Sequence, residues 1–159
     1  MSRSLRRALG VLVGTFVFAS VVPAVAASNE KPRTLDVDLA AKIAEAAPRR
    51  DRFAVDVPHR VSVADAGTWE TAGGLSTWRY TVRIPTAVSM SFHASAFDLP
   101  AGATLTVKSA DGARAVYTHA VATGELWSRI QRGDTLAFEL TVTEDERSSV
   151  QFALASLQA

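Results

Sequence analysis

The chain has 159 residues, no cysteine, and 17 basic against 16 acidic residues, which gives a formal net charge of +1. The absence of cysteine excludes a disulfide framework, a thiolate metal site and a cysteine nucleophile. The balanced charge provides no basic field, so we expect no nucleic-acid partner. A chain of this length can bury enough surface for one cooperative domain.

The first predicted element is a secretory signal peptide, residues 1–26. Three arginines precede an uncharged run that ends at Pro23 and Ala24-Val25-Ala26, and a signal peptidase would cut after Ala26. The alternative is an uncleaved anchor, because the run approaches the ~20 residues that span a bilayer. Cleavage leaves 14 of the 17 basic residues against 16 acidic ones, a formal charge of −2. We expect a secreted or periplasmic protein with no membrane contact after cleavage.

Residues 27–51 are expected to form a linker that contains one short helix, residues 36–47. Asp36 or Asp38 can accept hydrogen bonds from the first N–H groups of this helix, and Pro48 would end it. Leu39, Ile43 and the intervening alanines form one narrow apolar stripe. Such a stripe suits packing on a sheet edge or on a partner.

From Arg52 onward the hydrophobic period changes to two, which is typical of β-strands. Val55 and Val57 alternate with polar residues, Pro58 is expected to break this run, and the clearest strand is Thr77 to Ile84. Later strands alternate in the same way, with apolar positions at Val88, Met90, Phe92, Ala94, Leu105, Val107, Tyr117, Leu136, Phe138, Leu140, Val142, Val150, Phe152 and Leu154.

Turn signals separate these strands, at Gly73-Gly74, Pro100-Ala101-Gly102, Asp111-Gly112 and Gly133-Asp134. About eight short strands at near-regular spacing indicate an antiparallel sheet structure. We therefore predict an all-β fold, an antiparallel β-sandwich of jelly-roll type over residues 52–159, preceded by the one short helix.

Residues that could carry catalysis or bind metal form no recognisable motif. His59, His93 and His119 are isolated in the sequence, and no G-x-S-x-G is present. Asp36 with Asp38 and Glu144-Asp145-Glu146 do not match an EF-hand loop. We expect no catalytic constellation, no metal site and no cofactor.

The three tryptophans are the strongest candidates for binding residues. Trp78 is in phase with the apolar face of its strand, so we assign it to the core. Trp69 and Trp127 lie near strand ends and loops, where an aromatic ring can stack on a sugar or a peptide. We predict them as ligand or partner contacts.

Several local phrases occur in a defined order between Pro58 and Leu157: Gly67-x-Trp69, Trp78-Arg79-Tyr80-x-Val82-x-Ile84, Ser89-Met90-Ser91-Phe92, Phe97-Asp98-Leu99-Pro100-x-Gly102-Ala103-x-Leu105-x-Val107 and Gly124-Glu125-Leu126-Trp127. In this order they resemble the N-terminal pro-region of secreted bacterial trypsin-like serine proteases of the lysyl endopeptidase type. The resemblance implies a β-sandwich that assists folding of a protease. The protease domain of that family would begin after the position of Leu157, so no catalytic residue of the family can be assigned here.

The resemblance makes a folding helper or inhibitor of a trypsin-like protease the first functional expectation, with a protein partner that contacts the sandwich. One alternative is a carbohydrate-binding or adhesion module that uses Trp69 or Trp127 to stack on a glycan. A further alternative is a structural protein of the cell envelope.

Overall fold

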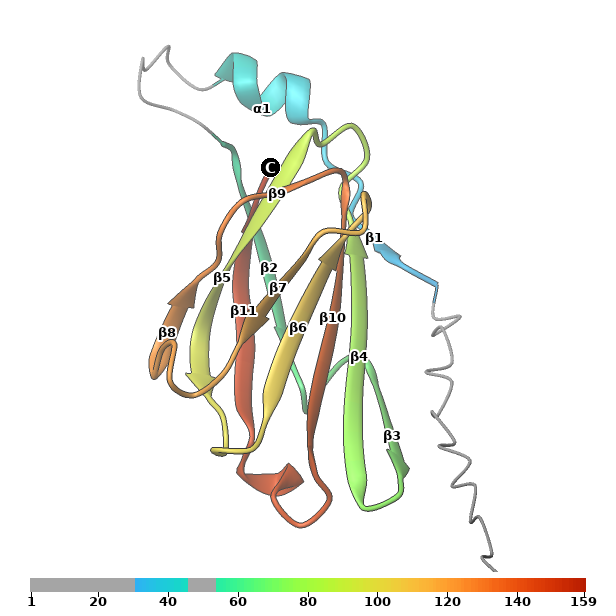
Figure 1. Cartoon of the computed structure of the whole chain (residues 1–159). Coiled ribbons are helices and arrows are strands. Elements are labelled where there is room, and N and C mark those ends of the chain that lie inside the picture. The colour runs from blue at the N-terminus through green and yellow to red at the C-terminus, as the bar shows by residue number, and fades with distance from the viewer. Residues whose placement is uncertain (1–30, 46–53) are drawn as a thin grey trace, which may run out of the picture.

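The computed structural model describes residues 31–45 and 54–159. The predicted signal peptide, its cleavage site and the helix stop at Pro48 lie outside the described residues. In the described part of the chain two β-sheets pack face to face, with one short α-helix at one end (Figure 1). The predicted all-β sandwich is therefore confirmed, while its jelly-roll connectivity stays a prediction.

Sheet A has six strands and sheet B has five. The strands of sheet A are β1 (Arg33–Thr34), β3 (Thr68–Ala72), β4 (Leu75–Arg83), β6 (Thr104–Ser109), β7 (Arg114–Tyr117) and β10 (Thr135–Thr143). Their order in the sheet is β1-β4-β10-β6-β7, and β3 also pairs with β4. The order in sheet B is β2-β11-β5-β8, and β9 also pairs with β5; its strands are β2 (Asp56–Ser62), β5 (Ser89–Asp98), β8 (Gly124–Trp127), β9 (Gln131–Arg132) and β11 (Gln151–Gln158). All described pairings are antiparallel except β1 with β4.

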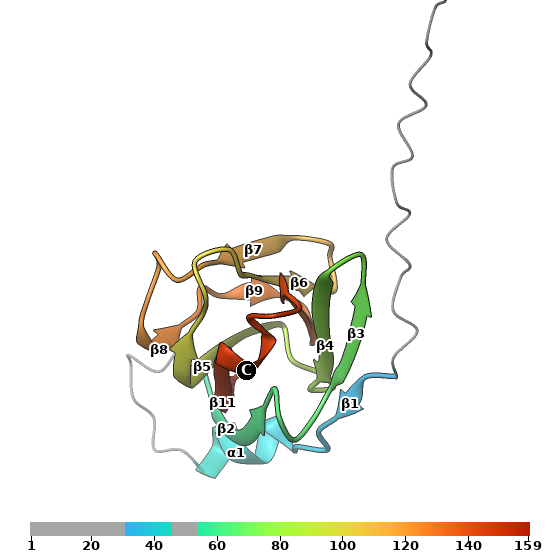
Figure 2. The same ribbon diagram turned by 90° about the horizontal axis from the view of Figure 1, so that it is seen from below.

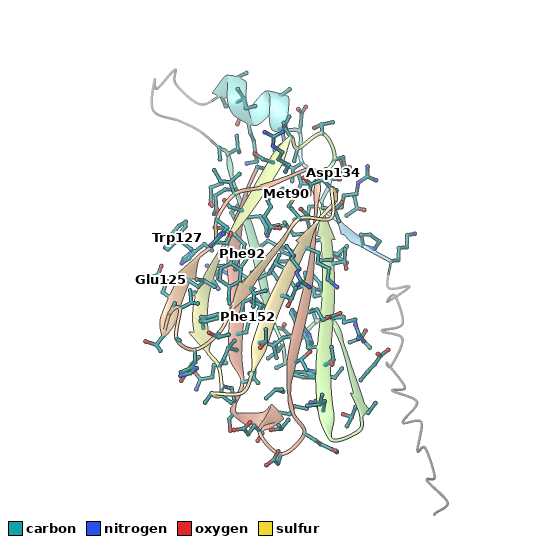
Figure 3. All side chains as sticks on the ribbon, viewed as in Figure 1. Met90, Phe92, Glu125, Trp127, Asp134 and Phe152 are labelled. Atoms are coloured by element: carbon teal, nitrogen blue, oxygen red, sulfur yellow. The ribbon has the colours of Figure 1, made fainter. Side chains whose placement is uncertain are left out.

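The core lies between the sheets and is rich in aromatic rings. Phe92 of β5 and Phe138 of β10 meet edge to face with centroids 5.1 Å apart, and Phe152 of β11 packs edge to face against Trp78 of β4 at 5.7 Å. All four side chains are fully buried, as the alternation of their strands predicts. Phe92 and Phe152 lie inside the sandwich in Figure 3.

The hairpin between β3 and β4 follows from its glycine pair. Gly73 and Gly74 have φ angles of 59° and 77°, and Ala72 pairs with Leu75 across the two-residue loop. Two successive positive φ angles define a type I′ turn, whose twist matches that of the flanking strands. The predicted Gly73-Gly74 turn is confirmed.

Two strand predictions need correction. Val88 is 86% exposed, although its phase with Met90 predicts burial, because the turn after Ile84 delays the start of β5 to Ser89. Pro58 does not break a strand, since β2 continues through it to Ser62. β2 is the outermost strand of sheet B, where a residue without an N–H group is tolerated.

The N-terminal segment lies against one side of the sandwich. Helix α1 (Leu39–Glu45) begins later than predicted, and Asp38 caps it by accepting a hydrogen bond from the N–H of Ala41 at 2.9 Å. Leu39 is its buried residue. Figure 2 places α1 beside β2, on the side of the molecule opposite β7. A short 3₁₀-helix, η1 (Arg147–Ser149), precedes β11.

Candidate binding site

Trp127 is the most exposed of the three tryptophans and lies at the end of strand β8. Its side chain is 62% exposed, and its ring stacks on the imidazole of His93 with centroids 3.9 Å apart and planes 7° from parallel. His93 and Trp127 are register partners in β5 and β8. Because paired residues of an antiparallel sheet point to the same side, both rings lie on the outer face of sheet B.

Glu125 fixes this pair of rings. Its Oε1 accepts hydrogen bonds from Nε2 of His93 at 2.5 Å and from the indole N–H of Trp127 at 3.2 Å. Trp127 and Glu125 are neighbours at the β8 side of the molecule in Figure 3. We call Trp127, His93 and Glu125 the Trp127 cluster. It holds one indole face against an imidazole and leaves the ring largely open to solvent.

A second set of polar groups continues across the same face of sheet B. The amide of Gln158 donates to Oδ1 of Asp56 at 3.2 Å and to Oγ of Ser156 at 2.9 Å, and its Oε1 accepts from the hydroxyl of Ser91 at 3.2 Å. Gln158 pairs with Ser91 on one side and with Asp56 on the other. Ser156 pairs with His93, so this polar row and the Trp127 cluster are adjacent.

Trp69 occupies a different environment on strand β3. Its indole N–H donates to the carbonyl of Val63 at 3.0 Å, and the guanidinium of Arg147 lies over its ring at 4.5 Å from the centroid. The ring borders a cleft of about 520 Å³, whose other lining residues are Val63, Ala64, Glu144, Arg147, Ser148 and Val150. Because Arg147 covers a ring face, Trp69 is less available for stacking than Trp127.

Trp78 belongs to the core, as predicted. It is fully buried, and its indole N–H donates to the carbonyl of Ala66 at 2.8 Å. Trp69 and Trp78 are register partners in β3 and β4, but the structure keeps Trp127 away from both of them, on the other sheet.

Large apolar side chains are exposed in the segment that runs from β7 of sheet A past β8 of sheet B. Val116 of β7 is exposed, Val121 in the following turn is 57% exposed, and Ile130 after β8 is 67% exposed. We call these three residues the apolar edge. β7 and β8 are the terminal strands of their sheets, and Figure 2 shows β7 on the side opposite α1. Exposed apolar residues beside open strand edges are typical of interaction surfaces.

His59 forms a polar contact between the sheets. Its Nε2 lies 2.7 Å from the hydroxyl of Tyr80, and its ring stacks on that of Tyr80 with centroids 5.9 Å apart. Burial, and to a smaller extent the charge of Arg33, lower the pKa of His59 below its usual value. A neutral His59 is therefore favoured in the folded state.

Residues 31–45 and 54–159 contain no group of three or more His, Cys, Asp or Glu side chains that could hold a metal ion. In the same ranges no helix has both the length and the apolar character needed to cross a membrane.

The sequence indicates Trp127 as a candidate contact residue, but it does not indicate the side chains that surround it. His93 and Glu125 lie 34 and 2 positions from Trp127. The register of β5 and β8 shifts between Ala94 and Phe97, so the pairing of His93 with Trp127 cannot be predicted from the spacing of residues along the chain. The i, i+2 spacing of Glu125 and Trp127 in one strand is a signal that could have been used, because such residues share a face.

Comparisons with protein-family models, with curated proteins and with solved structures give no match for this chain.

Proposed function

We propose that this protein is a non-catalytic, secreted β-sandwich that binds another protein, acting as a folding helper or inhibitor of a trypsin-like serine protease. The observation that carries the proposal is the apolar edge, where Val116 of β7, Val121 between β7 and β8, and Ile130 after β8 are exposed. These side chains lie within one segment, residues 116–130, and a partner that covers this segment removes their apolar surface from water.

The backbone of β8 adds a second element to this surface. The N–H of Ser128 donates to the carbonyl of Phe92 in β5 at 2.9 Å. Because N–H groups alternate in direction along a strand, that of Trp127 points away from β5, toward the open edge. An extended segment of a partner can add to such an edge through main-chain hydrogen bonds.

The other outer strand of sheet B is less suited to this role. β2 contains Pro58, which has no N–H group, and the exposed charged side chain of Arg60. Proline and charges on an outer strand discourage pairing with another chain. The contrast with β8, whose described residues include neither proline nor lysine nor arginine, supports the β8 side as the docking side.

The choice of a trypsin-like protease as the partner rests on the sequence resemblance to protease pro-regions. The phrases that carry it include Gly124-Glu125-Leu126-Trp127, which is strand β8 itself. The predicted signal peptide supports the same proposal, because a helper of a secreted protease must leave the cytoplasm with it.

The experiment uses the chain from Ala27 to Ala159 and a secreted bacterial trypsin-like protease of the lysyl endopeptidase type. We expect the chain to slow the protease or to raise its refolding yield from denaturant. The double variant Val121→Asp with Ile130→Asp should lose at least tenfold in affinity, because it places two charges in the contact.

The matched control is Ile43→Asp, which introduces the same charge at a 61% exposed isoleucine on α1, the helix that Figure 2 shows opposite β7. This control should bind as the parent chain does. The proposal fails if the parent chain neither slows nor helps refold the protease, or if Ile43→Asp weakens the effect as much as the double variant does.

A further inference from the structure

The outer face of sheet B carries an aromatic ring and a row of fixed polar groups that the apolar edge does not include. The ring is Trp127, with one face on His93 and its indole N–H directed to Glu125. The polar row consists of Ser91, Gln158 and Asp56, joined by hydrogen bonds through the amide of Gln158. These residues come from four neighbouring strands in the order β8, β5, β11 and β2.

The register of the strands aligns these groups in two adjacent rows. Trp127, His93 and Ser156 are consecutive register partners, and so are Ser91, Gln158 and Asp56. Adjacent strands lie about 4.8 Å apart, so the face from β8 to β2 is about 14 Å wide. This width exceeds one sugar ring, so the face suits an oligosaccharide better than a monosaccharide.

The composition of this face favours a glycan over a protein. Protein interfaces need several large apolar or aromatic side chains at their centre. On this face Trp127 is instead surrounded by polar side chains: His93 stacks on it, Glu125 lies on the same strand, and Ser91 and Gln158 lie on the next strands. A pyranose has one face of C–H groups, which stacks on an aromatic ring, and a rim of hydroxyl groups, which needs hydrogen-bonding partners.

We infer that the outer face of sheet B is an oligosaccharide-binding site, in which one pyranose packs on the exposed part of the Trp127 ring and further sugars of the chain contact the polar row of Gln158 and Asp56. Glu125 and Asp56 accept hydrogen bonds from sugar hydroxyls, and the amide of Gln158 donates and accepts. Because the carboxylate of Glu125 adjoins the ring, the stacked sugar carries no acidic group. This site goes beyond the proposed protein partner and does not depend on it.

The test is a titration of the chain from Ala27 to Ala159 with five neutral hexasaccharides: cellohexaose, chitohexaose, mannohexaose, xylohexaose and maltohexaose. Binding is followed by tryptophan fluorescence and by calorimetry. At least one hexasaccharide should bind saturably, and Trp127→Ala should weaken that binding about tenfold or more. Trp127→Phe, which keeps an aromatic face, should recover most of the loss.

Two control variants test whether a loss of sugar binding comes from the Trp127 ring itself. Trp69→Ala removes a tryptophan whose ring is already covered by Arg147, and it should leave the affinity unchanged. Val121→Asp with Ile130→Asp should also bind the hexasaccharide normally, although it loses the proposed protein partner. The inference is overturned if none of the five sugars binds at millimolar concentration, or if Trp69→Ala weakens binding as much as Trp127→Ala does.

Discussion

Gly67 lies where the chain passes over Trp78, and replacing it with alanine should be among the most damaging single changes in this protein. A Cβ atom at Gly67 would lie 2.4 Å from the indole nitrogen of Trp78 and 2.5 Å from the carbonyl oxygen of Arg79. The carbonyl belongs to β4 and cannot move aside. The φ angle of Gly67, 78°, adds a left-handed backbone that costs alanine about 1–2 kcal/mol.

Gly74 provides the matched control, because its φ angle of 77° is nearly the same as that of Gly67. A Cβ atom at Gly74 would have no heavy atom within 4 Å other than those of its chain neighbours. Gly74→Ala should therefore lower the free energy of unfolding by the backbone term alone, about 1–2 kcal/mol. Gly67→Ala should lower it by about 2–4 kcal/mol more, through overpacking and loss of the hydrogen bond from Trp78 to Ala66.

The assay is urea unfolding followed by tryptophan fluorescence, with equal denaturant slopes required for the comparison. Equal destabilisation by the two substitutions would refute this reasoning, because it would show that the close approach of Gly67 to Trp78 contributes nothing beyond the backbone angle.

Three further predictions concern single side chains. Thr86 has a φ angle of 69° in the turn that is closed by the hydrogen bond from Ala87 N–H to Ile84 C=O. Thr86→Gly should therefore raise the free energy of unfolding, measured by urea titration, by about 1 kcal/mol. A decrease would contradict the assignment of strain to Thr86. Burial lowers the pKa of His59 in the folded state, so the unfolded chain takes up a proton more readily, and stability should fall as the pH is lowered through about 6.5. His59→Gln should reduce that fall, and an unchanged pH profile in this variant would refute the effect. Gln131 is buried, and no described residue is a hydrogen-bond partner of its amide. Gln131→Leu should therefore raise the free energy of unfolding by about 1 kcal/mol or more. A lower Tm of this variant in calorimetry would contradict the prediction.

The sandwich could be predicted from the sequence because each of its strands has one buried face and one solvent-exposed face. Trp78 and Phe92 are buried where a period of two puts them, and Gly73-Gly74 forms the expected hairpin turn. Val88 shows the limit of this reasoning. Its phase with Met90 predicts burial, but the turn at Thr86 sets where the strand starts, and this turn depends on tertiary hydrogen bonds such as that from Gly133 N–H to Val88 C=O.

The candidate site was harder to predict, because its residues come together through strand register. Trp127 can be proposed from its type and its position near a strand end. The contact of Gln158 with Asp56 joins residues 102 positions apart, and a bulge between Leu154 and Ser156 determines which side chains of β11 face outward. A shift of one residue would reverse these faces, and spacing along the chain does not reveal it.

The most direct test of the proposed protein contact is a hydrogen-exchange comparison of the chain from Ala27 to Ala159, alone and mixed with a trypsin-like protease of the lysyl endopeptidase type. We predict that exchange slows in residues 118–130, which contain β8, Val121 and Ile130, while α1 exchanges as before. Unchanged exchange in residues 118–130, or protection confined to α1 and β2, would contradict the account.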